Sequence, residues 1–224
     1  MPNKATRRDF LAAAGKGLAI AGFPAIVPAS VLGVFAPGNR INVGAIGTGR
    51  ISRAHDLPGI WQYDSARIMA VCDLDSRRAH DAVTLVNDHY ARQSGKPYSG
   101  VTAYTNYREL LANTDIDAVV ISTPDHWHAL IAIDAVAAGK DVYLQKPASL
   151  TIAEGRALSD AVHRSGRIFQ IGSQQRSMTQ FRYAAELVRN GRVGKLQTVE
   201  IGLPGDPPGD EEPEMPVPKH LNYD

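Results

Sequence analysis

The chain contains 224 residues, of which 44% are hydrophobic and 21% are charged, and its formal net charge at neutral pH is +1. A net charge this close to zero does not indicate binding to nucleic acid, which requires a strong local excess of lysine and arginine. The single cysteine, Cys72, excludes an intramolecular disulfide bond. The composition therefore fits a soluble enzyme.

The first residues of the chain have the pattern of an export signal. Twin arginines, Arg7 and Arg8, precede an apolar, alanine-rich stretch that extends to about Ala25. This pattern predicts a twin-arginine signal peptide over residues 1–36 and export to the periplasm. A lysine, several glycines and a proline interrupt the stretch, so no stable membrane anchor is expected. A basic, disordered N-terminus is the alternative.

An apolar run at residues 41–46 breaks into the turn Gly47-Thr48-Gly49. The run predicts a buried parallel strand, and the glycines lead into a helix predicted over residues 50–62. Such a turn lets backbone N–H groups at a helix N-terminus approach a pyrophosphate with no side chain in the way. We therefore expect a dinucleotide to contact Gly47, Thr48, Gly49, Arg50 and Ile51. Ser52 stands where a third glycine is usual, and an ordinary strand–turn–helix connection is the alternative.

A second apolar run, over residues 67–73, ends in Asp73. A carboxylate at the end of the second strand can accept hydrogen bonds from an adenosine ribose, and its charge would repel the 2′-phosphate of NADP. The pattern therefore predicts NAD as the cofactor. Arg77 and Arg78 follow closely enough to weaken this preference, which keeps NADP as the alternative. Asp73 could instead cap the helix predicted over residues 76–93.

The middle of the chain alternates strands and helices. Further strands are predicted over residues 117–122, 141–145 and 168–172, and further helices over residues 107–113, 124–138, 151–165 and 178–190. Thr151 and Glu154 form a capping-box pattern, and Thr123 is placed to cap the helix that Pro124 opens. This alternation predicts an α/β fold with a doubly wound parallel sheet, which we assign to residues 37–173.

Residues 174–224 are predicted to begin a second, incomplete α/β domain. The strand-like run at residues 196–201 is followed by a proline-rich, acidic stretch over residues 204–218. A lone strand followed by a loop cannot form a domain. We therefore expect a C-terminally truncated chain; the alternative is that residues 196–201 complete the preceding sheet.

In a doubly wound sheet, ligands bind beyond the carboxyl ends of the strands. That rule adds residues after the later strands to the predicted cofactor site: Ser122, Thr123, Pro124, His126, His128, Gln145 and Gln174. His126 and His128 are not expected to bind a metal, because helical residues two apart do not share a face. We expect both rings to face the nicotinamide end of the cofactor, with solvated histidines as the alternative.

Lys146 is the predicted catalytic residue. It stands at a strand end, and Pro147 restricts its backbone to an extended conformation. An ammonium group there could hydrogen-bond a substrate hydroxyl and stabilise the alkoxide character that develops as hydride leaves. An exposed lysine without such a role is the alternative.

Four motifs, in their order along the chain, resemble the Gfo/Idh/MocA oxidoreductases: Gly47-x-Gly49, Ser122-Thr123-Pro124-Asp125-x-x-His128, Gln145-Lys146-Pro147 and Gly172-Ser173-Gln174-Gln175-Arg176-Ser177. The resemblance spans roughly residues 41–201, and the segment Gln174-Gln175-Arg176-Ser177 resembles the exported bacterial members of the family. It implies a Rossmann fold, NAD or NADP, a sugar or polyol substrate, catalysis by Lys146 and a role for His128. It also implies a second domain that supplies further catalytic residues and often the contact of a homo-oligomer.

The chain departs from the family pattern at three positions. Ser52 replaces the third glycine, Asp125 stands where asparagine is frequent, and Gln145 replaces the usual glutamate before Lys-Pro. The loss of a carboxylate at position 145 removes a negative charge that would favour the protonated form of Lys146.

The leading hypothesis is an exported oxidoreductase that transfers hydride between a tightly bound NAD and a sugar, polyol or sugar derivative. Outside the cytoplasm there is no NAD pool with which to exchange, so the cofactor is expected to be restored within each catalytic cycle. An NAD-dependent glycosidase that oxidises, eliminates and re-reduces its substrate is the enzymatic alternative. A non-catalytic nucleotide or sugar sensor is the other alternative.

Overall fold

The computed structural model describes residues 40–203, 205, 209 and 213–223. The export signal predicted over residues 1–36 lies outside the described residues. Six strands form one parallel sheet in the order β3-β2-β1-β4-β5-β6. They are β1 (Ile41–Ile46), β2 (Ala66–Cys72), β3 (Thr102–Tyr104), β4 (Ala118–Ile121), β5 (Asp141–Leu144) and β6 (Phe169–Ile171). This strand order confirms the predicted doubly wound parallel sheet.

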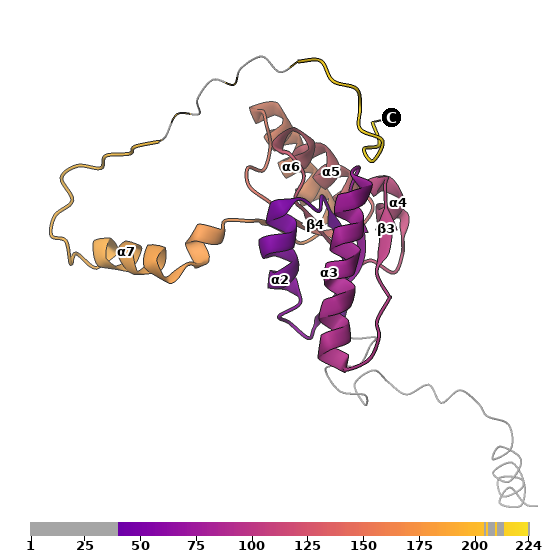
Figure 1. Cartoon of the computed structure of the whole chain (residues 1–224). Coiled ribbons are helices and arrows are strands. Elements are labelled where there is room, and N and C mark those ends of the chain that lie inside the picture. The colour runs from indigo at the N-terminus through magenta and orange to yellow at the C-terminus, as the bar shows by residue number, and fades with distance from the viewer. Residues whose placement is uncertain (1–39, 204, 206–208, 210–212, 224) are drawn as a thin grey trace, which may run out of the picture. The chain divides into compact units, whose positions relative to one another are not determined.

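Helices connect the strands (Figure 1). The segment after β1 contains a π-helical turn, η3 (Ser52–Asp56), and continues as α2 (Leu57–Ile60). The other connections are made by α3 (Ser76–Ser94), α4 (Tyr107–Ala112), α5 (Asp125–Ala137) and α6 (Ile152–Ser165), and β6 is followed by the 3₁₀ helix η4 (Gln174–Ser177) and α7 (Thr179–Arg189). None of the helices in the described part of the chain has the length and apolar content needed to span a bilayer.

The sheet is covered on both faces by apolar clusters. Neighbouring residues of one strand, such as Ala45 and Ile46, belong to different clusters because successive side chains of a strand point to opposite faces. The first cluster includes Leu57 of α2, and the second includes Ile131 of α5. Cys72 packs in the second cluster, and burial raises the pKa of its thiol to about 12. Cys72 therefore behaves as a small apolar residue.

The caps of α5 and α6 test two predictions about helix ends. The Thr151 hydroxyl accepts a hydrogen bond from the Glu154 backbone N–H at 3.2 Å, and the Glu154 carboxylate accepts one from the Thr151 N–H at 3.0 Å. This confirms the capping box of α6. At α5 the N-cap is Pro124, and no side chain caps the helix. The prediction that Thr123 caps α5 is therefore wrong, because Thr123 lies one residue too early to reach the first free N–H groups.

Residues 196–201 do not form a strand. They are exposed and have no regular secondary structure, and the sheet ends at β6. The alternative that this run completes the preceding sheet is therefore wrong. A short apolar run becomes a strand only where a neighbouring strand offers hydrogen-bond partners. Helix α7 likewise contains no buried residue, although its apolar side chains follow one face.

Candidate functional site

The carboxyl ends of β1 and β4 meet at the point where the order of the sheet reverses. Gly47 follows β1 and has a φ of +83°, a backbone conformation that favours glycine. A Cβ atom on Gly47 would lie 2.7 Å from the carbonyl carbon of Ser122 and 2.8 Å from the backbone nitrogen of Thr123. The fold itself therefore requires glycine at position 47. Since Gly47 has no side chain, the predicted residues after β1 and β4 can lie in direct contact.

Gly49, in contrast, is not required by the fold. A Cβ atom built on Gly49 would meet no other atom within 4 Å, and the backbone there is not left-handed. Helical structure begins at Arg50, so free N–H groups of the first turn lie next to this open space. The missing side chain at Gly49 leaves the helix N-terminus open to a negatively charged group from outside the protein.

Asp73 binds the glycine turn from the end of β2. Its Oδ2 atom accepts hydrogen bonds from the Thr48 N–H at 2.7 Å and from the Thr48 hydroxyl at 3.0 Å, and its Oδ1 atom accepts one from the Asp75 N–H at 2.9 Å. A carboxylate has about four acceptor positions, so one remains for a ligand hydroxyl. The N-cap of α3 is Asp75, which accepts hydrogen bonds from the N–H groups of Arg77 and Arg78. The alternative that Asp73 caps this helix is therefore wrong.

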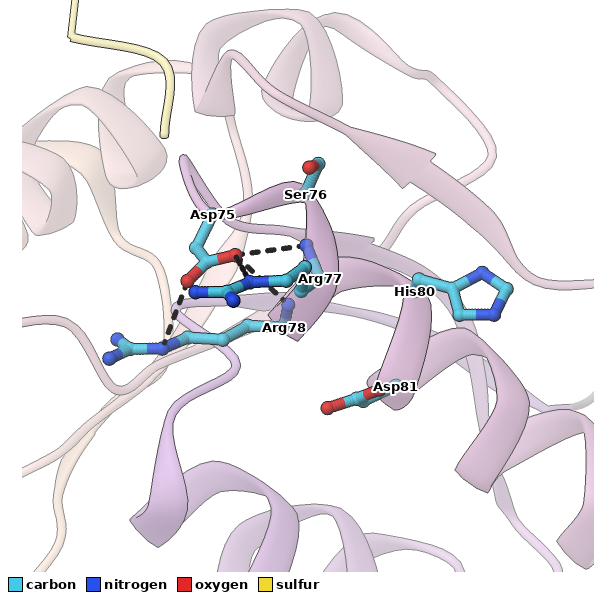
Figure 2. A pocket seen from close by; sticks show the side chains of 6 residues that line it. All are labelled: Asp75, Ser76, Arg77, Arg78, His80 and Asp81. Carbon is cyan, nitrogen blue, oxygen red and sulfur yellow. Dashed lines mark hydrogen bonds and ion pairs between the residues drawn. The ribbon is translucent and has the colours of Figure 1, made fainter. Parts of the chain in front are cut away.

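Basic side chains line an open concavity beside Asp73, at the first turns of α3. Figure 2 shows the carboxylate of Asp75 turned toward Arg77 and Arg78. Both guanidinium groups lie 3.7 Å from this carboxylate and are largely exposed. Ser76, His80 and Asp81 complete the lining of the concavity, whose volume is about 600 Å³. A positive charge next to Asp73 would attract the 2′-phosphate of NADP and so weakens the predicted preference for NAD.

A segment close to the C-terminus contacts the same connection between β2 and α3. The His220 carbonyl accepts hydrogen bonds from the Ser76 N–H at 2.9 Å and from the Ser76 hydroxyl at 3.1 Å. Leu221 forms an isolated antiparallel bridge with Asp75, and the His220 ring contacts the Arg77 side chain. This contact was not predicted, because polar backbone pairing between distant segments leaves no periodic pattern in the sequence.

His128 is buried, with 1% of its surface exposed. Its Nδ1 atom lies 2.5 Å from the Pro147 carbonyl oxygen, and its Nε2 atom lies 2.8 Å from the Thr123 carbonyl oxygen. Both ring nitrogens are therefore occupied by the backbone, and the predicted direct contact of His128 with a cofactor does not hold in this structure. The ring instead links the loop after β4, at Thr123, with the loop after β5, at Pro147. His126 is exposed in the first turn of α5, as a ligand-facing residue requires.

Lys146 is exposed directly after β5, and its backbone N–H lies 3.3 Å from the Gln145 side-chain oxygen, which accepts its hydrogen bond. Gln145 is buried, and its amide nitrogen donates to Asp56 Oδ1 at 2.7 Å. The other oxygen of Asp56 accepts a hydrogen bond from the Ser122 hydroxyl at 2.6 Å. Asp56 thus joins the ends of β4 and β5 next to the predicted catalytic residue.

Asp56 was not among the site residues predicted from the sequence. Its only signal was a carboxylate on the helix that follows the glycine turn. The π-helical turn that contains Asp56 changes which side of the helix each residue faces, and the hydrophobic period does not encode such a turn. Pro124 and Gln174 are exposed after β4 and β6, and no described residue hydrogen-bonds the Gln174 side chain. The structure therefore places Gln174 at the predicted edge of the sheet, without a side-chain hydrogen bond to the other site residues.

These features fit a bound dinucleotide. Gly49 leaves space at a helix N-terminus, Asp73 keeps one acceptor position, and the hydroxyl of Thr123 is buried without a hydrogen-bond partner among the described residues. A buried hydroxyl without a partner is costly unless a ligand supplies one. Within the described ranges, no three side chains of histidine, cysteine, aspartate or glutamate group together so that they could hold a metal ion.

Residues 41–173, more than half of the chain, match the oxidoreductase family with an NAD-binding Rossmann fold that is known as Gfo/Idh/MocA. An α-N-acetylgalactosaminidase from Shewanella oneidensis is 31% identical over 169 residues, which are 75% of this chain and 36% of that protein. The chain spans about 36–44% of the length of the curated relatives that it matches.

Solved structures give the same result for the fold. The crystal structure of myo-inositol 2-dehydrogenase from Lactobacillus plantarum superposes with a TM-score of 0.57 at 29% identity, covering 70% of this chain and 43% of that one. The WlbA dehydrogenase from Bordetella pertussis, solved with NADH and UDP-GlcNAcA, gives a TM-score of 0.58 at 25% identity, covering 70% of this chain and 42% of that one.

Proposed function

The chain belongs to the Gfo/Idh/MocA oxidoreductase family, and we propose that the protein transfers hydride between a tightly bound NAD and a sugar, polyol or sugar derivative. The observation that carries this proposal is the open helix N-terminus at Gly49, where the sheet order reverses and where the fold itself does not require glycine. Two similar structures support the substrate class: one is named a myo-inositol 2-dehydrogenase, and the other was solved with UDP-GlcNAcA.

In this proposal, cofactor binding and proton transfer are assigned to different residues of the chain. When bound, NAD supplies the hydride acceptor. The backbone N–H groups at Gly49, Arg50 and Ile51 would hold the pyrophosphate, and Asp73 would hold the adenosine ribose. Lys146 hydrogen-bonds the substrate hydroxyl through Nζ and takes up its proton as the carbon–hydrogen bond breaks. The electron pair of the O–H bond stays on the substrate oxygen and forms the carbonyl double bond as the hydride leaves the carbon.

The enzymatic alternative is a glycosidase that oxidises its substrate, eliminates the leaving group and reduces the product with the same NAD. The name of the Shewanella oneidensis relative favours this alternative. Incubating the full-length protein with free sugars and with aryl glycosides separates the two. An oxidoreductase yields a ketone product or a reduced cofactor, whereas a glycosidase releases the aglycone and leaves the cofactor oxidised.

We also propose that residues 1–36 direct export by the twin-arginine route and that residues 174–224 begin a second α/β domain with a homo-oligomer contact. The exposed apolar side chains of α7 support the second part, because they have no partner among the described residues. Fractionation of cells that express the protein with Arg7 and Arg8 changed to lysine tests the first part. Retention of the variant in the cytoplasm supports export, and unchanged export contradicts it.

We expect Gly49→Val to weaken NAD binding by the 224-residue chain at least about 10-fold, because the new side chain fills the space at the helix N-terminus. The free energy of unfolding should change by only about 1 kcal/mol, since no atom lies within 4 Å of the added Cβ. Fluorescence titration with NADH and urea denaturation measure the two effects. Equal affinity of the variant and the wild type would show that the pyrophosphate binds elsewhere.

The preference for NAD is expected to depend on the charge of Asp73. Asp73→Asn keeps an oxygen that can accept from Thr48 but removes the charge that repels a 2′-phosphate. The ratio of the dissociation constants for NADP and NAD should therefore fall by about 10-fold in the variant. Competition titrations with both nucleotides measure this ratio. A wild type that binds NADP as tightly as NAD would refute the assignment of Asp73 to the ribose.

A further inference from the structure

The segment over residues 218–223 packs on the loop between β2 and α3. The His220 carbonyl accepts a hydrogen bond from the Ser76 N–H at 2.9 Å, and the Asn222 N–H donates to the Leu74 carbonyl at 2.9 Å. The Ser76 hydroxyl adds a second hydrogen bond to the His220 carbonyl, at 3.1 Å. An antiparallel backbone pairing therefore holds this segment on the loop.

The pairing occupies a backbone donor in the first turn of α3. A helix leaves the N–H groups of its first turn without partners inside the helix, and such groups attract phosphate. The N–H groups of Arg77 and Arg78 donate to the Asp75 carboxylate at 2.9 and 3.4 Å. The Ser76 N–H is the third donor, and the His220 carbonyl accepts its hydrogen bond. With the segment in place, none of these three N–H groups is left for a phosphate.

The His220 side chain contacts a basic group that would otherwise attract a phosphate. The Arg77 guanidinium contacts the His220 ring and lies 3.7 Å from the Asp75 carboxylate (Figure 2). The His220 ring itself lies 3.7 Å from the same carboxylate. Arg77 thus has two partners within the chain, and a phosphate would have to compete with both of them for its N–H groups.

These contacts lie beside the residue to which we assign the adenosine ribose. Asp73 accepts a hydrogen bond from the Asp75 N–H at 2.9 Å, so its carboxylate adjoins the loop that leads into α3. NADP differs from NAD by a phosphate on the 2′ oxygen of this ribose, and such a phosphate is commonly bound by an arginine nearby. The first-turn N–H groups of α3 and the Arg77 side chain are suitable donors beside Asp73. Segment 218–223 engages both kinds of donor.

We propose that segment 218–223 determines the choice of cofactor: the His220 carbonyl closes the N-terminus of α3 and the His220 ring engages Arg77, so that NAD is accepted and NADP is disfavoured. The proposal rests on the proposed function, in which Asp73 binds the ribose of a nicotinamide dinucleotide. The two arginines that follow Asp73 would by themselves favour NADP, and the segment opposes their effect. NAD needs no donor from α3, because its 2′ substituent is a hydroxyl that the Asp73 carboxylate can accept from.

Asn222→Pro tests the proposal in the 224-residue chain. Proline removes the N–H that donates to the Leu74 carbonyl, which releases the segment from the loop. The ratio of the dissociation constants for NADP and NAD should fall by about 10-fold, because the Ser76 N–H and Arg77 become free to bind the 2′-phosphate. The dissociation constant of NAD should stay within about threefold. Competition titrations against NADH fluorescence measure both constants, and hydrogen exchange of the Ser76 amide measures the release of the segment.

Two matched variants separate the backbone pairing from other effects. Asn222→Ala keeps the N–H and should keep the wild-type ratio. Ser76→Pro removes from α3 both groups that bind the His220 carbonyl, and proline suits this first helical position because Asp75 before it is already extended. Ser76→Pro therefore releases the segment without freeing the N–H for a phosphate. Its ratio should fall by no more than about threefold.

His220→Ala tests the side chain alone. It keeps the backbone pairing with Ser76 but removes the ring that contacts Arg77. The ratio of the two dissociation constants should fall by about threefold, while the Ser76 amide stays protected from exchange.

Three results would overturn the proposal while the proposed function stands. The first is a wild type that binds NAD but whose Ser76 amide exchanges freely, because the segment would then not bind the loop. The second is an unchanged ratio in Asn222→Pro although its Ser76 amide exchanges at least about 10-fold faster than in the wild type. The third is an equal fall in Ser76→Pro and Asn222→Pro, because the N–H groups of α3 would then play no part. A wild type that binds neither nucleotide would refute the proposed function itself, and the choice of cofactor with it.

Discussion

Gly47→Ala is expected to destabilise the chain by roughly 2–5 kcal/mol. The left-handed backbone at Gly47, with a φ of +83°, costs a residue with a Cβ atom about 1–2 kcal/mol. The Cβ atom would also lie 2.7 Å from the Ser122 carbonyl carbon, and moving a packed backbone costs about 1–3 kcal/mol more. Since a domain of this kind is stable by only about 5–15 kcal/mol, the loss should be a large fraction of the total. Urea denaturation followed by circular dichroism measures it.

Gly95 provides the matched control for this experiment. It ends α3 with a φ of +66°, but a Cβ atom there would meet no atom within 4 Å. Gly95→Ala should therefore show the backbone cost alone, about 1–2 kcal/mol, and should leave NAD affinity unchanged. If Gly47→Ala and Gly95→Ala lose the same stability, then β1 and β4 do not approach each other at the switch point as closely as the structure shows.

The sheet was predictable because its central strands are apolar and short. Residues 43–46 of β1 and 70–72 of β2 are buried on both faces, and such strands appear in the sequence as continuous apolar runs. Strand β3 was not predicted, because Thr102–Tyr104 is a three-residue edge strand whose first two residues are exposed. An edge strand is defined by its pairing with β2, and the composition of three residues does not encode that pairing.

The site was predictable to the extent that topology determines it. Because the carboxyl ends of parallel strands share one edge of the sheet, Gly47, Asp73, Ser122 and Lys146 could be grouped from strand positions alone. Which side chain contacts which neighbour depends on side-chain packing, which the sequence does not show. His128 is the example, since its helical position suggested a ligand contact and the structure gives both of its ring nitrogens to backbone carbonyls.

The departure at Gln145 has a physical explanation in the structure. In the sequence, glutamine in place of the family glutamate indicated only the loss of a charge beside Lys146. The structure shows that Asp56 faces the Gln145 amide at 2.7 Å, so a second carboxylate at position 145 would be repelled. A carboxylate is therefore present beside Gln145 but belongs to a different element, η3. Ser52 has no such compensation, because its hydroxyl is buried without a partner among the described residues.

Lys146→Ala is expected to lower the turnover of the full-length protein by roughly 10²–10⁴, the usual contribution of a positioned acid–base group. Its affinity for NAD should stay within about 10-fold, because we assign the pyrophosphate to Gly49 and the ribose to Asp73. A lysine that served mainly to hold the cofactor would instead lose NAD affinity, with turnover surviving at saturating nucleotide. Fluorescence titration of NAD and single-turnover reduction of the bound cofactor distinguish these cases.

Lys96→Ala is the matched control for this last experiment, since Lys96 is also exposed but lies after α3, outside the site. It should change neither the affinity nor the rate. Lys146→Arg adds a second comparison, because arginine keeps the positive charge but does not release its proton near neutral pH. The arginine variant should therefore bind NAD normally and remain as slow as the alanine variant. A near-wild-type single-turnover rate in either Lys146 variant would contradict the assignment of Lys146 as the group that exchanges a proton with the substrate.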